Sequence, residues 1–144
     1  MPAVRDILAR KGTLVVTTAP DATVLEAARL MNQRGIGAVL VMEGAMLRGI
    51  FTERDLMVRV VAEQRDPSTT PVRDVMSRRL VTARAETTVE QCAALMTQNR
   101  IRHLPVLGGD NVAGVVTIGD LLAYQLAEQE MTITQLNSYL YDVR

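Results

Sequence analysis

The sequence has little of three things that many functional sites need: aromatic side chains, cysteine and histidine. It holds no tryptophan and only 3% aromatic residues, so it offers few stacking platforms for single-stranded nucleic acid. Cys92 is its single cysteine, which excludes an internal disulfide and argues against a cysteine zinc cluster. We therefore expect no metal site, and we expect Cys92 to be a small buried residue rather than a reactive thiol.

Charge of one sign and long apolar runs are missing as well. The 16 Lys and Arg residues balance the 16 Asp and Glu residues, so there is no basic field to attract nucleic acid, and we do not expect nucleic-acid binding. No apolar run is long enough to span a bilayer, and the first residues lack the apolar segment of a signal peptide. These features predict a cytoplasmic protein with no membrane contact.

Motifs of catalysis are also missing. The chain has one histidine, no Gly-x-Ser-x-Gly elbow, no Walker phosphate loop, and no set of histidines or carboxylates at metal-ligand spacing. Gly35-Ile36-Gly37 leads into a predicted strand, whereas a dinucleotide fingerprint follows a strand and opens a helix. We expect neither an enzyme nor a catalytic cofactor.

What the sequence does contain is a tandem repeat. Residues 17–56 align with residues 82–121 without a gap, and about fourteen of forty positions are identical. Each copy closes with a Gly, two apolar residues, a Thr and, three positions later, an Asp. The lead-in Val4-Arg5-Asp6-Ile7-Leu8 also recurs, as Val72-Arg73-Asp74-Val75-Met76. These patterns divide the chain into a first unit (residues 1–64), a linker (65–71), a second unit (72–127) and a C-terminal helical tail (128–144).

Hydrophobic periodicity predicts strand, helix, strand, strand and helix in each unit, and hence an α+β fold. Capping signals at Thr23 and Thr88 start the first helix of each unit, and Gly35 ends the earlier one. The predicted strands of the first unit are residues 14–16, 38–42 and 47–51, and residues 80–82 begin the second. Short lead-in helices are expected over residues 2–10 and after Thr70-Pro71, which supplies an N-cap and a Pro at the first helical position. Pro105 predicts an incompletely paired edge in the second hairpin.

The tail has its own pattern. Thr132 is predicted to cap a further helix, and the apolar residues of that helix recur at spacings of three, four and three: Ile133, Leu136, Leu140 and Val143. This apolar stripe either docks on its own domain or packs against a second subunit, with Tyr139 and Tyr141 nearby. The pattern leaves both alternatives open.

The residues best suited to bind a ligand lie in the Gly-apolar-apolar-Thr-x-x-Asp segment that ends each repeat. We call these two segments, residues 49–55 and 114–120, the closing phrases. The carboxylates of Asp55 and Asp120 lie near predicted helix starts, where each can accept two hydrogen bonds from the 2′- and 3′-hydroxyls of a ribose. Thr52 and Thr117 add hydroxyl donors, and a helix N-terminus favours an anion such as phosphate. A simpler interpretation is that each Thr-x-x-Asp is only a helix cap, worth about 1 kcal/mol. Recurrence after the same Gly and apolar pair favours a functional role.

These phrases, together with Arg100-Ile101-Arg102-His103-Leu104-Pro105-Val106 before the second of them, resemble a tandem pair of CBS domains, a Bateman module. The resemblance extends from the lead-in helix to about Leu126 and is strongest to small stand-alone bacterial CBS proteins. It implies two β-α-β-β-α units related by a pseudo-twofold axis. It also implies clefts that bind adenine nucleotides or their relatives: AMP, ADP, ATP, NAD or S-adenosylmethionine.

In such modules each cleft takes its Thr and Asp from one unit and its adenine-facing strands from the other. The resemblance therefore implies a first cleft made by Thr52, Arg54, Asp55, Val81, Thr82, Arg102, His103, Leu104 and Pro105. It implies a second cleft made by Val16, Thr17, Gly37, Ala38, Val39, Leu40, Thr117 and Asp120. We expect the first cleft to bind a phosphorylated adenosine more tightly, because Arg54, Arg102 and His103 can pair with phosphate. We expect the second cleft to be weak, empty or suited to an uncharged adenosine portion. The matching positions of the second are Gly119, Gly37 and Ala38, and Leu40 replaces the proline typical of the family. His103 as a packed strand residue remains an alternative.

The resemblance implies a regulatory, ligand-sensing module that binds an adenine nucleotide and signals by a conformational or dimer change to a regulated protein that the sequence does not identify. Members of the family usually form homodimers through the helices beside the clefts, which here would offer Leu56, Met57, Val60, Leu121, Leu122 and Leu126. The alternative is a protein-interaction scaffold that has lost its ligands and acts through its dimer and C-terminal helix.

Overall fold

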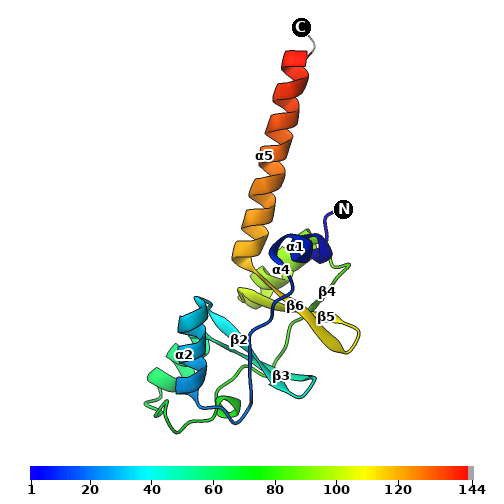
Figure 1. Cartoon of the computed structure of the whole chain (residues 1–144). Helices are drawn as coiled ribbons and strands as arrows, with labels where there is room; N and C mark the ends of the chain where they lie inside the picture. Colours follow the sequence, from blue (N-terminus) through cyan, green and yellow to red (C-terminus); the bar gives the residue numbers. More distant parts are fainter. Residues whose placement is uncertain (143–144) are drawn as a thin grey trace.

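The chain forms two three-stranded sheets, one in each repeat. The structure, a computed structural model, describes the backbone of residues 1–142 and the side chains of residues 1–138. The first sheet has the order β1-β2-β3, and its strands are Thr17–Thr18, Ala38–Glu43 and Met46–Thr52. The second has the order β4-β5-β6, and its strands are Ala83–Arg84, His103–Gly108 and Asn111–Thr117. In each sheet a short strand runs parallel to the first strand of an antiparallel hairpin. Figure 1 shows the two hairpins, β2–β3 and β5–β6.

Helices flank both sheets, and the predicted α+β class is confirmed. The helices are α1 (Val4–Lys11), α2 (Val24–Arg34), α3 (Glu53–Asp55, continued by a π-helical turn over Leu56–Val61), α4 (Val89–Asn99) and α5 (Ile118–Asp142). Thr23 and Thr88 cap α2 and α4 as predicted, because their hydroxyls accept the amide protons of Glu26 and Gln91 at 3.1 and 3.0 Å. Gly35 ends α2 in the left-handed conformation, with φ of 62°.

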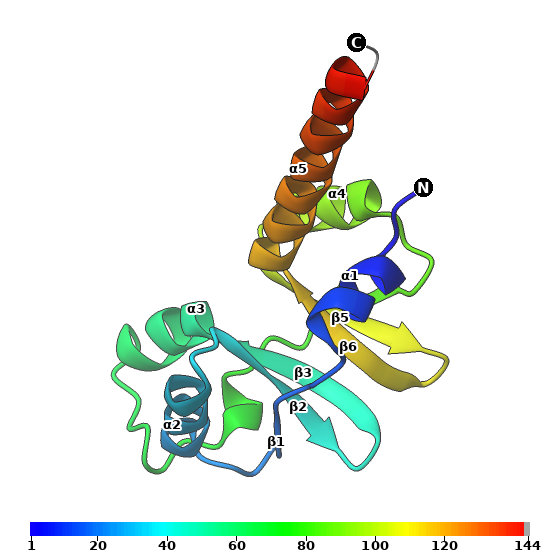
Figure 2. The same cartoon turned by 45° about the horizontal axis from the view of Figure 1, so that its top comes forward.

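Each unit has its own hydrophobic core, and the lead-in segment of each unit packs into the core of the other. The second core, around Cys92, Leu104 and Val106, contains Val4 and Leu8 of α1. The first core, around α2 and β2, contains the lead-in residues Val72, Val75 and Met76 of the second unit. Figure 2 shows α1 over β5 and β6 rather than over the first sheet. The two units are therefore interlocked at both lead-ins.

The glycine of each closing phrase makes room for this exchange. A Cβ on Gly49 would lie 2.7 Å from the Met76 sulfur and 2.8 Å from the Ser77 carbonyl oxygen, and one on Gly114 would lie 2.9 Å from Leu8 Cδ2. All three distances are shorter than a Cβ atom tolerates. The repeated glycine is thus explained by the close approach of the opposite lead-in.

The short first strands lie three residues later than predicted. Residues 14–16 and 80–82 were predicted as strands from their apolar character, but the strands are Thr17–Thr18 and Ala83–Arg84. Only the Val16 carbonyl joins the ladder early, accepting the Leu40 amide at 3.1 Å. Leu14 is 77% exposed and, with Val16, faces a cavity between the units. Apolar character here serves a cavity wall rather than a buried strand.

The lead-in of the second unit differs from the prediction as well. Thr70 does not cap a helix, because its buried hydroxyl donates to the Asp66 carbonyl at 2.7 Å. Pro71 is itself the N-cap, and only a 3-10 turn, Val72–Asp74, follows. The loop before Pro71 closes on itself through Asp66, which leaves the Thr70 side chain turned inward.

The C-terminal helix does not begin at Thr132. α5 runs without a break from Ile118 to Asp142, and the Thr132 hydroxyl donates back to the Glu128 carbonyl at 3.0 Å. The reason is that residues 127–131 are strong helix formers with no Gly or Pro to interrupt them. The predicted side chains at Tyr139, Leu140, Tyr141 and Val143 lie outside the described part of the chain. Within the described residues, no helix is both long and apolar enough to cross a bilayer.

Candidate functional site

A cavity of about 400 Å³ lies between the two units. Its walls come from the end of α1 and the segment after it, from the loop between α2 and β2, from both hairpins, and from the first turn of α5. The lining residues are Lys11, Leu14, Val16, Gly35, Ile36, Gly37, Ala38, Leu40, Ile50, His103, Val115, Thr117 and Asp120. The cavity thus brings together six of the eight residues expected in the second cleft: Val16, Gly37, Ala38, Leu40, Thr117 and Asp120.

The two remaining residues of the second cleft lie elsewhere for reasons of strand geometry. Side chains alternate across a strand, so Ala38 and Leu40 face the cavity while Val39 is buried in the first core. Thr17 is exposed and pairs with Leu40 across the β1–β2 ladder. A consecutive run of strand residues cannot all line one site.

Asp120 is the acid of this cavity, and it is held from two sides. Its Oδ2 accepts the Thr117 amide at 2.8 Å, and its own amide donates to Thr117 Oγ1 at 3.1 Å. Lys11, from the end of α1, donates to the same Oδ2 at 2.6 Å and to the Val115 carbonyl at 2.8 Å. Both side chains keep some solvent exposure, 31% for Lys11 and 21% for Asp120. An ammonium group and a carboxylate therefore form an ion pair at the cavity wall, and both remain accessible to a ligand in the cavity.

Asp55, the matching acid of the first unit, is more completely enclosed. Only 5% of the residue is exposed. Its Oδ2 accepts the amide and the hydroxyl of Thr52 at 3.0 and 3.1 Å, and its Oδ1 accepts the Ser77 hydroxyl at 2.9 Å. Arg59 Nε adds an ion pair at 3.7 Å. Both oxygens of this carboxylate already have protein partners.

The other residues expected in the first cleft divide between surface and interior. Arg54 and Arg102 are exposed, whereas Leu104 belongs to the second core and Pro105 is buried. Val81 packs against that core, and Thr82 is half-buried. The β4 ladder reaches only Val106 and Leu107 and stops one residue short of Pro105, whereas the matching ladder of the first unit includes Leu40. The edge is therefore less fully paired at Pro105, as the proline predicted.

His103 lies in the cavity with Asp120, although it was expected in the first cleft. It is half-buried, and its Cε1 is 3.4 Å from the point where a Cβ on Gly37 would stand. Burial lowers the pKa of His103; Glu53 opposes this effect, whereas Lys11 and Arg102 add to it. At neutral pH the imidazole is therefore uncharged and offers hydrogen bonds rather than a positive charge.

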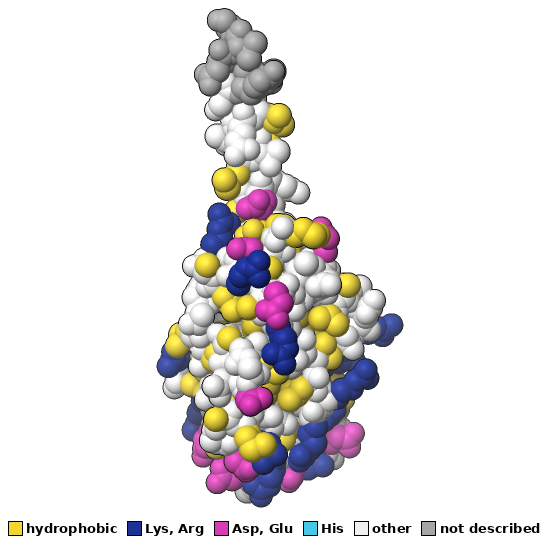
Figure 3. Space-filling view, turned by 90° about the vertical axis from the view of Figure 1, so that its right-hand side faces the viewer, with side chains coloured by type: hydrophobic (Ala, Val, Ile, Leu, Met, Phe, Trp, Pro, Cys, Tyr) yellow, Lys and Arg dark blue, Asp and Glu magenta, His cyan; other side chains and the backbone are white. Residues whose placement is uncertain are grey.

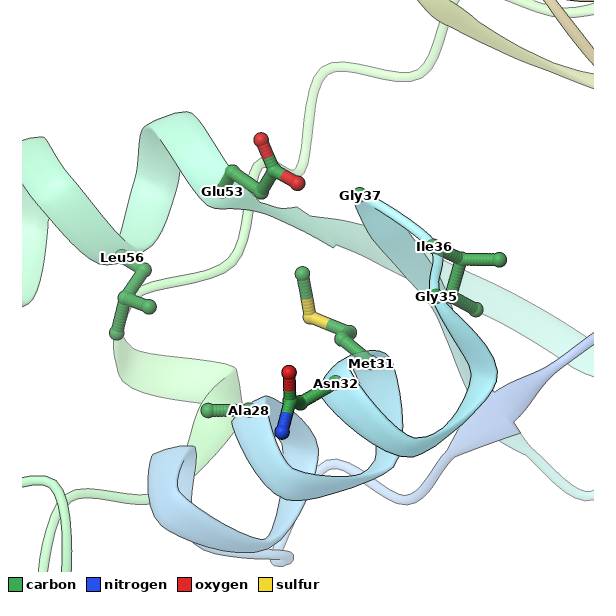
Figure 4. A pocket seen from close by; sticks show the side chains of 8 residues that line it. All are labelled: Ala28, Met31, Asn32, Gly35, Ile36, Gly37, Glu53 and Leu56. Carbon is green, nitrogen blue, oxygen red and sulfur yellow. The ribbon is translucent and has the colours of Figure 1, made fainter.

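A smaller cavity of about 320 Å³ adjoins the first one at Gly35, Ile36 and Gly37. It lies within the first unit between α2 and α3, and Figure 4 shows the Met31 side chain rising from α2 into the gap between Glu53 and Gly37. Its lining holds one ionisable group, Glu53, and no cation. Its charge is therefore unsuited to a phosphate.

Sequence reasoning missed Lys11 and Ser77, which contact the two acids. Neither belongs to the repeated phrase, and both reach their acid because a lead-in segment packs on the opposite unit. No pattern in the sequence signals that exchange. Cys92 behaves as expected: it is fully buried, and desolvation raises the pKa of its thiol to about 11.

The interlocked β-α-β-β-α units and the cavity between them define a tandem module of a known class. The chain belongs to the CBS domain family, whose pattern it matches over residues 4–62 and 72–127. It is therefore a pair of CBS domains, a regulatory module.

Two relatives match most of the chain. The CBS domain-containing protein YhcV of Bacillus subtilis strain 168 is 39% identical over 129 residues, which cover 90% of this chain and 89% of YhcV. The crystal structure of the CBS-domain containing protein ATU1752 from Agrobacterium tumefaciens is 36% identical, with a TM-score of 0.82 over 85% of this chain and 98% of the other. A third, the CBS domain pair of protein MJ0100, was solved with 5′-methylthioadenosine and S-adenosyl-L-methionine. It is 23% identical, with a TM-score of 0.78 over 89% of this chain and 98% of the other, and so shares the fold alone.

Proposed function

We propose that this protein is a non-enzymatic regulatory module that binds a phosphorylated adenosine compound, of the AMP, ADP, ATP or NAD class, in the cavity between its two CBS units. The observation that carries the proposal is the meeting of Asp120, Thr117 and Lys11 at the wall of one cavity. Its volume of about 400 Å³ falls within the usual range of small-molecule sites. MJ0100, which has the same fold, holds adenosine compounds, and this supports the ligand class.

The chemistry of the wall suits the three parts of such a ligand. Leu14 and Val16 offer apolar surface for a base, and the Asp120 carboxylate can accept hydrogen bonds from a ribose diol. Lys11 supplies the positive charge that the sequence pattern did not reveal in this cleft. A diol that binds Asp120 competes with Lys11 and releases its ammonium for a phosphate.

The preferred site in this proposal is the second cleft rather than the first. Arg54 and Arg102 support a phosphate near the first cleft, but the Asp55 carboxylate is buried and engaged by Thr52 and Ser77. A diol at Asp55 would have to displace bonds within the folded core. A diol at Asp120 replaces one partly exposed ion pair, which costs about 0–1 kcal/mol.

Signalling would follow from the position of the cavity. Lys11 belongs to α1 and Asp120 to α5, so a ligand that separates them acts on two helices at once. A ligand shifts such an equilibrium only by its differential affinity for the two states. We propose that the readout is the geometry of a homodimer, whose apolar contacts include Met57 and Leu122, exposed by 60% and 55%.

A thermal-melt panel with AMP, ADP, ATP, NAD, S-adenosylmethionine and GMP as a guanine control tests this function. A ligand at a hundred times its dissociation constant adds about 2.7 kcal/mol, which raises the melting temperature by several degrees. We expect an adenosine phosphate to raise it, Asp120→Ala to abolish most of the rise, and Asp55→Ala to retain it once the lower stability of that variant is subtracted. No shift with any adenosine compound at millimolar concentration would favour the alternative, an interaction scaffold whose Lys11–Asp120 pair keeps the cavity closed.

A further inference from the structure

From Leu122 to Leu136, α5 carries an apolar face that nothing in the described chain covers. The helix projects from the second unit as a narrow column (Figures 1 and 3). Every described side chain from Glu128 to Ser138 is exposed. Leu122, Leu126, Ile133 and Leu136 are each exposed by between 55% and 58%.

These residues follow the repeat of a coiled coil. Together with Gln129 they occupy positions 122, 126, 129, 133 and 136, at spacings of four, three, four and three. Such alternation gives the 3.5-residue period that keeps one narrow row facing a partner helix as the two wind around each other. A helix that lies on its own domain instead shows a broader apolar face. We call the row of these five residues the α5 row.

The charges beside the α5 row favour a second copy of the same helix as the partner. The positions that flank the row in a coiled coil carry Ala123, Gln125, Glu130, Thr132 and Asn137. Only Glu130 among them is charged, and in a parallel pair it faces Gln125 of the partner subunit, which can donate a hydrogen bond. Two copies therefore meet without like-charge repulsion, whereas an acidic partner finds no opposite charge beside the row and a basic partner finds only Glu130.

The part of α5 that projects beyond the second unit also needs a partner to be stable as a helix. Thr132, Ile133, Thr134, Asn137 and Ser138 are weak helix formers, and an unsupported helical segment of this length is marginal in water. Burial of the row against a like helix supplies the stabilisation that propensity does not.

We propose that α5 pairs with α5 of a second copy as a parallel, in-register, two-stranded coiled coil through the α5 row. Gln129 fixes the direction. In a parallel pair it meets the partner's Gln129, and the two amides can bond to each other, whereas an antiparallel pair sets it against an apolar residue and leaves a buried amide unsatisfied. Parallel pairing places the second unit of one copy beside the second unit of the other.

Cysteine cross-linking of the full chain tests the surface, the partner and the direction together. Gln129→Cys places a thiol inside the row, and Met131→Cys places one at 51% exposure on the outer side of the same helix. Cys92 is fully buried and does not compete. With oxidised glutathione at micromolar protein, we expect Gln129→Cys to form a covalent dimer at least about tenfold faster than Met131→Cys, because pairing raises the effective thiol concentration.

A second change, made in the Gln129→Cys background, distinguishes pairing through the α5 row from nonspecific hydrophobic association. Ile133→Glu puts two carboxylates against each other in the pair and should remove the cross-link. Met131 is also apolar and exposed but lies outside the row, so Met131→Glu should leave the cross-link intact. Equal cross-linking of Gln129→Cys and Met131→Cys, or no cross-link at position 129, would overturn the proposal. So would a cross-link that survives Ile133→Glu. All three positions, 129, 131 and 133, are exposed, so none of these outcomes depends on the stability of the core.

Discussion

Lys11 is the residue whose role the structure changes most. It ends α1, and its ammonium lies 2.6 Å from the carboxylate that we propose for ribose binding. One side chain therefore competes with the sugar and is released to attract the phosphate. Selectivity for phosphorylated ligands over a bare nucleoside would follow from this exchange.

Replacing Lys11 with Met should affect adenosine and AMP in opposite directions. Adenosine should bind up to a few-fold tighter, because Asp120 no longer has a competing partner. AMP gains the same relief at Asp120 but loses a partly exposed charge contact worth about 1 kcal/mol, a factor of about five, so it should bind up to about fivefold weaker. Isothermal titration of both ligands measures this. Arg10→Met is the matched control, since Arg10 on the same helix lies over Tyr124 and outside the cavity lining. A parallel loss of both ligands in Lys11→Met would contradict the proposed exchange.

His103 predicts how stability depends on pH. Its folded pKa lies below the ordinary value of 6.5, mainly because of burial, so the unfolded state binds the proton more readily. The contribution of His103 to the free energy of unfolding is fully present above pH 6.5 and declines as the pH falls from about 6.5 toward the folded pKa. His103 is the only histidine, so His103→Gln should flatten the fall in melting temperature between pH 7.5 and 5.5. An unchanged slope in that variant would assign the fall to other groups.

The contacts that Gly49 and Gly114 make with the opposite lead-in segments differ in how easily they can accommodate a larger side chain. A Cβ on Gly49 meets a backbone carbonyl at 2.8 Å, whereas one on Gly114 meets only the flexible end of Leu8. Gly49→Ala should therefore cost about 1–3 kcal/mol of unfolding free energy, and Gly114→Ala less than about 1 kcal/mol. Urea unfolding of the two variants gives the comparison. Equal costs would mean that the Ser77 backbone moves as easily as a side chain.

Helices and hairpins were predictable from the sequence, and the short strands and long tail were not. Periodicity and capping located α2, α4 and both hairpins because these elements bury one regular face. The residues before the short strands are apolar for other reasons: Leu14 and Val16, before β1, line the cavity, and Val81, before β4, packs against the second core. The start predicted at Thr132 relied on a cap signal, but Thr132 lies within a helix that its neighbours continue.

At the scale of the whole molecule, the sequence identified the ingredients of the site but not their grouping. The repeat located both acids, and the family resemblance listed the strands around them. Which lead-in reaches which acid depends on the exchange of α1 and residues 72–76 between the two cores, and that exchange involves contacts far apart in the chain. For this reason Lys11 was missed and His103 was assigned to the other cleft.

The most direct test of the central proposal is the location of the ligand on the folded chain. Amide chemical shifts of isotope-labelled protein, followed by NMR during titration with AMP, report which backbone groups a bound nucleotide approaches. We expect the largest saturable shifts at Gly37, Ala38 and Thr117, around the cavity that holds Lys11 and Asp120. Shifts centred on Thr52 and Thr82 would place the nucleotide in the first cleft, and no saturable shift at millimolar AMP would contradict nucleotide binding altogether.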